Sequence, residues 1–176
     1  MTLFRIPAAL WSIVPFLLIS CASSRQFVKN PERLEHVVNI AIAGIDCDAD
    51  GVGNGIVDGL SSQLLMSKYN IIEREKFLKI LDEQRLTLTD FLSERESIVG
   101  RIKGVDAIIV GNASVQSGWA GLAFGGYKTY ISTARMIDVA TGEVLLAVTY
   151  SNSNPSTNAT PTDIGIKLGK KIMASK

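Results

Sequence analysis

The feature that most constrains the fold is an almost unbroken apolar run over residues 37–45 (VVNIAIAGI). A strand with one face in water alternates apolar and polar residues, whereas a strand covered on both faces is apolar throughout. Residues 105–110 (VDAIIV) have the same character. Both runs are therefore predicted to be central strands of a sheet that is covered by helices.

Helical periodicity follows the first of these strands and recurs further along the chain. Residues 56–68 and 73–85 place apolar residues three and four positions apart, and residues 90–103 show a weaker form of the pattern. Thr160 can cap a last helix that has Pro161 at its first position. The buried stripe of this helix is predicted to be Ile164, Leu168 and Ile172.

Shorter strands are predicted at 69–72, 129–139 and 144–150. The last two are joined by a turn in which Gly142 supplies the positive φ that a tight hairpin requires. The order β-α-β-α-α-β-β-β-α predicts an α/β fold, a two-layer sandwich with about three to four helices packed on a sheet of mixed strand direction.

The first 20 residues have the layout of a secretory signal. Arg5 precedes an apolar run over 6–19, which is shorter than the roughly 20 residues needed to span a bilayer as a helix. Pro7 and Pro15 argue against a helical anchor, because each would break the helix. We therefore expect residues 1–20 to be removed from the mature protein.

Residues 18–21 (LISC) resemble the bacterial lipobox. The resemblance implies that Cys21 becomes the first mature residue and carries a diacylglycerol with fatty acids such as palmitate, which anchors the chain to a membrane. Ala22 replaces the aspartate that usually retains such proteins in the inner membrane of enterobacteria, so we expect the outer membrane, with the domain facing the periplasm. Residues 21–36 are predicted to be the lipidated cysteine and a polar tether, and residues 37–176 the folded domain.

Composition narrows the possible partners. Removal of Arg5 with the signal leaves 17 of the 18 basic residues beside 17 acidic ones, so no nucleic-acid partner is expected. Cys47 has no second cysteine to pair with once Cys21 carries lipid, and it is predicted to be buried. His36 is the only histidine and is expected at the surface near the tether. No catalytic arrangement or cofactor is predicted.

Three segments, in order, are similar to the CsgG family, the curli production assembly/transport lipoproteins and their relatives. They are residues 69–84, which combine a strand, an ERE triplet and a helix ending in Glu-Gln, residues 104–111 (GVDAIIVG) and residues 134–144 (ARMIDVATGEV). The resemblance covers about residues 38–150. It implies an outer-membrane lipoprotein with an α/β periplasmic domain that can form a homo-oligomer and bind other envelope proteins.

The curli exporter of this family forms a ring to whose transmembrane barrel each copy contributes two β-hairpins. Residues 115–126 (VQSGWAGLAFGG) resemble the first hairpin, and the candidate oligomer or membrane contacts there are Trp119, Phe124, Gly118, Gly121 and Gly125. Residues 151–160 are too short and polar to supply the second hairpin, and residues 46–55 lack the aromatic residue of the exporter's constriction. Pore formation is therefore not predicted.

A calcium loop is a further hypothesis. The spacing of Asp46, Asp48, Asp50 and Asn54 matches the start of an EF-hand, but Val57 occupies the position of its bidentate glutamate. The alternative interpretation is a β-to-α loop whose acidic residues cap the next helix.

The sequence thus predicts a lipid-anchored envelope protein that acts by assembly or binding in secretion or envelope biogenesis, and not by catalysis. The alternative is a tethered periplasmic binding module, similar to the lipoproteins that activate peptidoglycan synthases. A tether of about a dozen residues would reach only about 40 Å, which disfavours this alternative.

Overall fold

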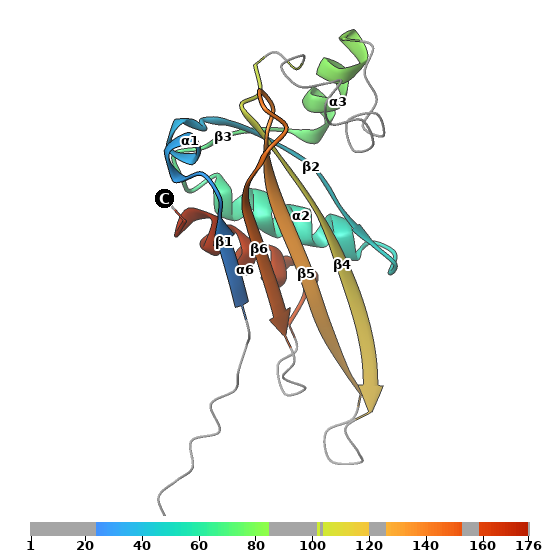
Figure 1. Ribbon diagram of the computed structural model, residues 1–176. Coiled ribbons are helices and arrows are strands. Elements are labelled where there is room, and N and C mark those ends of the chain that lie inside the picture. Colours follow the sequence, from blue (N-terminus) through green and yellow to red (C-terminus); the bar gives the residue numbers. More distant parts are fainter. Residues whose placement is uncertain (1–23, 85–101, 103, 120–125, 153–158, 176) are drawn as a thin grey trace, which may run out of the picture.

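The computed structural model describes residues 24–84, 102, 104–119, 126–152 and 159–175. Figure 1 shows one long, twisted sheet with helices packed against it. The strands are β1 (Ser24–Val28), β2 (Asn39–Cys47), β3 (Asn70–Ile72), β4 (Ala107–Trp119), β5 (Gly126–Asp138) and β6 (Val144–Asn152). The helices are α1 (Pro31–His36), α2 (Val52–Leu64), α3 (Arg74–Glu83) and α6 (Pro161–Met173).

The six strands follow the order β1-β6-β5-β4-β2-β3. β2 is parallel to both β3 and β4, whereas the pairs β4–β5, β5–β6 and β1–β6 are antiparallel. The α/β class and the mixed sheet predicted from the sequence are confirmed. The predicted helix at 90–103 lies outside the described residues, apart from Ile102.

The larger core lies between the sheet and the helix pair α2–α6. Its sheet side includes Ile40, Ile42 and Ile109. Its helix side contains the stripe predicted for α6, Ile164, Leu168 and Ile172, each at most 1% exposed. Thr160 caps α6 together with Asp163 in a reciprocal capping box, as its sequence predicts.

The opposite face of the sheet is also partly covered. Phe77 and Leu81 of α3 pack there with Ala41, Ile108 and Ile137. β2 and β4 therefore have apolar residues on both faces, which explains their unbroken apolar runs. Helices thus contact both faces of the sheet and not only the one expected for a plain two-layer sandwich.

The N-terminal segment differs from the expected tether. Residues 24–28 form β1, which pairs along its whole length with β6, and α1 follows with Asn30 as its N-cap. Leu34 of α1 is only 1% exposed and belongs to the larger core. The segment looks polar in sequence because β1 is an edge strand whose middle residues face water. Residues 24–36 therefore belong to the folded domain and not to a polar tether.

Two further expectations need correction. α2 begins at Val52, four positions before the predicted start, and its N-cap is Gly51 at φ 74°, without a side-chain cap. The prediction that acidic residues cap this helix is therefore wrong. β4 continues to Trp119, far beyond the predicted end at residue 110, because β5 pairs with it over its whole length.

In the described part of the chain, no helix is both long enough and apolar enough to cross a membrane.

Candidate functional site

The antiparallel pair β4–β5 extends beyond the rest of the sheet as a two-stranded ribbon. β2 leaves β4 at Ala113, and β6 leaves β5 at Tyr130. From Ser114 to Trp119, β4 is therefore paired only with β5, and Trp119 lies opposite Gly126 at the last described pair. An isolated two-stranded hairpin is marginally stable in water, and the free edges of this ribbon are available for a further contact.

The ribbon points toward the end of the sheet where β1 begins. Ser24 pairs with Tyr150, and Tyr150 pairs with Ser132 on β5. From Ser132, β5 continues six residues back to Gly126, which is roughly 20 Å of extended strand. Figure 1 shows the start of β1 and the ends of β4 and β6 at this same end of the molecule. The ribbon therefore projects past the first residue of β1.

The predicted hairpin contacts lie at the end of this ribbon. Gly118 is a half-buried residue of β4, and Trp119 is the last residue of that strand. Phe124, Gly121 and Gly125 lie outside the described residues. Cys21 also lies outside them, three positions before Ser24.

The described part of the ribbon is polar on both faces. Gln116 and Ser117 are exposed, and Ser117 lies opposite Lys128 in the register. A strand exposed to lipid needs an apolar residue at every second position over its length. The described ribbon lacks such a stripe, because Val115, Tyr130 and Ile131 lie at its base and the other large apolar residues, Trp119 and Tyr127, lie near its end.

The acidic residues of the calcium hypothesis do not converge. Asp46 belongs to β2, Asp48 and Asp50 lie in the following turn, and Asn54 is in α2. No group of three or more His, Cys, Asp or Glu side chains in the described ranges could hold a metal ion. Cys47 is half-buried, and its Sγ lies 3.5 Å from Asp48 Oδ1.

The aspartate of the ARMID segment has a structural partner that the sequence analysis missed. Asp138 is 1% exposed and accepts hydrogen bonds from Arg33 Nε and from the backbone N–H groups of Ala140 and Thr141. Burial raises the pKa of Asp138, but the hydrogen bond from Arg33 and those from Thr141 and Ala140 outweigh it, so the net pKa is lowered. This network joins α1 to the β5–β6 turn, where Gly142 has φ 70°.

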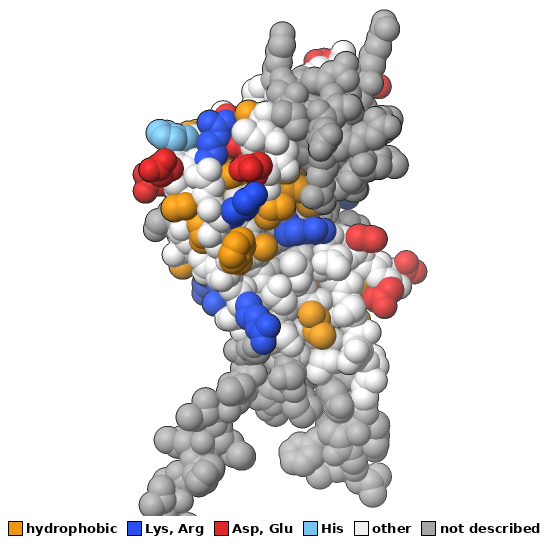
Figure 2. All heavy atoms as spheres, in the orientation of Figure 1, with side chains coloured by type: hydrophobic (Ala, Val, Ile, Leu, Met, Phe, Trp, Pro, Cys, Tyr) orange, Lys and Arg blue, Asp and Glu red, His pale blue; other side chains and the backbone are white. Residues whose placement is uncertain are grey.

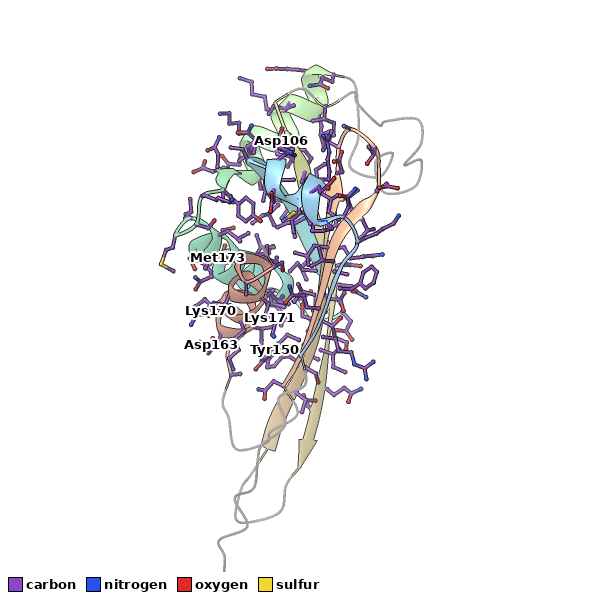
Figure 3. The ribbon with its side chains drawn as sticks, turned by 60° about the vertical axis from the view of Figure 1, so that its left-hand side comes forward. Asp106, Tyr150, Asp163, Lys170, Lys171 and Met173 are labelled. Atoms are coloured by element: carbon purple, nitrogen blue, oxygen red, sulfur yellow. The ribbon has the colours of Figure 1, made fainter. Side chains whose placement is uncertain are left out.

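Asp106, from the GVDAIIVG segment, is also structural. Its Oδ2 accepts hydrogen bonds from the backbone N–H groups of Val38 at 3.0 Å and Asn39 at 2.7 Å. Figure 3 shows Asp106 at the upper part of the sheet, away from Tyr150 and α6. The aspartates in both segments thus stabilise the fold through hydrogen bonds from backbone N–H groups.

A cavity of about 530 Å³ lies beside the second half of β2. Its lining includes Ala43–Asp46 of β2, Val110–Asn112 of β4, Arg135 of β5 and Arg74 at the start of α3. Nε of Arg135 is buried without a hydrogen-bond partner in the described structure. No local sequence pattern could have predicted this cavity, because distant parts of the chain supply its two arginines.

These features define an α/β domain with a projecting hairpin and open sheet edges, of a kind suited to assembly or binding. The family model of the curli production assembly/transport component CsgG matches residues 41–171. The chain therefore belongs to the CsgG family. No curated protein matches its sequence.

Two solved structures share this fold at low sequence identity. The PelC dodecamer from Paraburkholderia phytofirmans is 12% identical, with a TM-score of 0.52 over 88% of this chain and 96% of that one. Lipoprotein GNA1162 from Neisseria meningitidis is 15% identical, with a TM-score of 0.52 over 79% of this chain and 99% of that one.

Proposed function

We propose that this protein is a lipid-anchored lipoprotein of the bacterial envelope, held at the outer membrane through Cys21 and facing the periplasm. It assembles as a homo-oligomer whose β4–β5 hairpins contact the membrane or each other. It acts by assembly or binding in secretion or envelope biogenesis, and not by catalysis. Membership of the CsgG family supports the general role.

One observation carries the membrane contact. Three residue steps separate Cys21 from Ser24, so the lipidated cysteine can lie at most about 10 Å from the start of β1. The hairpin projects roughly 20 Å past Ser24 along the strands, further than this connection can reach. With Cys21 at the bilayer surface and the strands along its normal, the end near Trp119 enters the interfacial region, where tryptophan is favoured.

The anchor is tested by changing the lipidated residue. Cys21→Ser should move the full-length protein from the membrane fraction to the soluble periplasmic fraction, because the hairpin alone offers only a short apolar end. The measurement is fractionation of cells that express the protein, with Cys47→Ser as a control that should stay in the membrane fraction. Membrane retention of Cys21→Ser at the unchanged level would contradict lipid anchoring.

The hairpin contact has its own test. The double variant Trp119→Ala with Phe124→Ala should weaken assembly or membrane retention and leave the thermal midpoint of unfolding nearly unchanged. Retention is compared in salt-washed vesicles, with the exposed ribbon variant Gln116→Ala as the matched control. If the double variant assembles and stays bound as the unaltered protein does, the hairpin has no contact role.

The oligomer is supported by the similar fold of PelC, which is a dodecamer. Copies arranged around an axis parallel to the strands would place every hairpin and every Cys21 on the same side of the ring, toward one membrane. The native mass of the full-length protein in mild detergent tests this, and a monomer would contradict it.

The short connection to β1 also bears on the alternative function. A module that activates peptidoglycan synthases has to reach away from its membrane, whereas about 10 Å between Cys21 and β1 keeps this domain at the lipid surface. The structure therefore favours assembly at the membrane over action at a distance.

A further inference from the structure

The sheet has an unpaired strand edge at each side. β1 pairs with β6 on one side, and no described strand pairs with its other side. β3 pairs with β2 only from Asn39 to Ala41, so β2 has an edge from Ile42 to Cys47 that pairs with no described strand and is called its open edge. This stretch bulges between Ile42 and Gly44, and the start of α2 packs against it at one point, since a Cβ on Gly53 would lie 2.1 Å from the carbonyl oxygen of Ile45. Edges of this kind bind further strands readily, and proteins that do not use them usually block them.

The two edges are compatible in direction and length. β6, β4 and β2 run in the same direction, and β1 runs opposite to them. Rotation about an axis parallel to the strands keeps these directions, so β1 of one copy would lie antiparallel to β2 of the next. β1 has five residues, and the open part of β2 has six.

The charges on the two sides are complementary. Near the end of β2, Asp46, Asp48 and Asp50 are exposed, and none forms an ion pair with another described residue. Figure 2 shows acidic side chains gathered at the right-hand side, at the level where β2 ends in Figure 1.

The opposite side of the sheet carries basic residues. Arg25 of β1 is exposed, and α6 adds the exposed residues Lys167 and Lys170. α6 lies beside β1 and β6, since Gln26 Nε2 donates a hydrogen bond to Ser175 Oγ just beyond α6. Figure 3 turns this side toward the reader and shows Lys170 and Lys171 on α6.

The other ends of the two edges match as well. α1, which follows β1, carries the exposed residues Glu32 and Glu35. Arg74 lines a cavity of about 350 Å³ together with Ile42, where the open part of β2 begins. Antiparallel pairing would place Arg25 near the acidic end of β2. At the other end it would bring Glu32 and Glu35 near Arg74, which lies between the exposed residues Glu73 and Glu75.

We propose that β1 of one copy adds to the open edge of β2 of the next copy, so that a sheet continues from subunit to subunit around a closed ring. The contact is head-to-tail: two different surfaces of each copy meet, as a ring requires. This inference rests on the proposed homo-oligomer and names its interface.

A proline on the outer edge of β1 tests the backbone pairing. Lys29 N–H donates to Leu145 O, and the bonds of antiparallel strands alternate, so the N–H of Gln26 points away from β6. Gln26→Pro removes an outward donor and spares the pairing with β6, and prolines are tolerated at such edges. We expect it to convert the detergent-extracted full-length protein to monomers, while Gln26→Ala, the matched control, still assembles.

Charge reversal tests the same contact without altering the backbone. Arg25→Asp alone and Asp48→Arg alone should each raise the protein concentration needed for half-assembly by about tenfold or more, because like charges then face each other. The combined variant, with both charges reversed, should assemble more readily than either single variant. Circular dichroism checks that each variant is folded.

The outcomes separate the two proposals. A monomeric unaltered protein would overturn the homo-oligomer itself. A ring that persists in folded Gln26→Pro, or reversals that leave assembly unchanged, would overturn the edge-to-edge contact and leave the homo-oligomer standing. If Gln26→Pro fails to fold, the reversals decide, and failure of the combined variant to recover assembly counts against the contact.

Discussion

Gly165→Ala is expected to lower the free energy of unfolding by about 3 kcal/mol, although glycine to alanine inside a helix ordinarily stabilises by about 1 kcal/mol. The reason is the close approach of α6 to α2. A Cβ on Gly165 would lie 2.0 Å from the carbonyl oxygen of Ile56 and 2.7 Å from the backbone nitrogen of Leu60. Both contacts are with backbone, so no side chain can move aside to relieve them.

The same contact exists in the other direction. A Cβ on Gly59 of α2 would lie 2.1 Å from the carbonyl oxygen of Thr162, so Gly59→Ala should destabilise comparably. The two changes separate the same pair of helices, so their combined effect should be less than the sum of the two.

Urea denaturation followed by circular dichroism measures the change, with Lys170→Ala as the control on the exposed side of α6. The control should stay within about 0.5 kcal/mol of the unaltered protein. A Gly165→Ala protein that is as stable as the unaltered one would mean that α2 and α6 lie further apart than the structure places them.

The parts of the fold that the sequence predicts are those specified by local chemistry. Thr160 and Asp163 specify the start of α6 within four residues, and Gly142 specifies the β5–β6 turn. The apolar run that begins at residue 37 predicts the burial of β2 on both faces without knowledge of its partners.

The parts that the sequence could not predict depend on distant partners. β1 has the sequence SRQFV, which carries no strong strand pattern, and its pairing with β6 decides its conformation. β4 beyond Val110 is rich in polar residues and glycine, and β5 holds it extended. Tertiary pairing overrides local preference in both cases.

The candidate site likewise has one part that the sequence predicts and one part that it does not. The glycine-rich surroundings of Trp119 predict a hairpin contact there, and the structure places this residue at the end of β4, while the contact itself stays a prediction. The open edge of β2 has no counterpart in the sequence, because it exists only where β3 stops pairing at Ala41. An unpaired edge is a property of the assembled sheet, and a list of residues does not reveal it.

Asp138→Asn is expected to lower the free energy of unfolding at pH 7 by about 3 kcal/mol, since it removes the charge of a buried aspartate that accepts three hydrogen bonds. One bond comes from Arg33, whose side chain remains 45% exposed, so the main loss is of bonds to the carboxylate and not of a fully buried ion pair. The variant should loosen α1 and the β5–β6 turn together.

The loss should depend on pH. The folded-state pKa of Asp138 is lowered, so the folded protein binds the proton less readily than the unfolded chain, whose aspartate pKa is about 3.9. The stabilisation is therefore fully present well above pH 4 and is lost as the pH falls through the folded-state pKa. The difference in thermal midpoint between the unaltered protein and Asp138→Asn should be largest near pH 7 and should narrow below about pH 4.

Glu143→Gln is the matched control in the same turn. Glu143 pairs with Lys29 at 3.4 Å, but both side chains are about half exposed, so this change should cost no more than about 0.5 kcal/mol at any pH. Thermal unfolding of the three proteins from pH 7 to pH 3 measures both effects. A midpoint difference for Asp138→Asn that stays constant over this range would mean that the carboxylate charge contributes nothing, and that only the geometry of its hydrogen bonds attaches α1 to the turn.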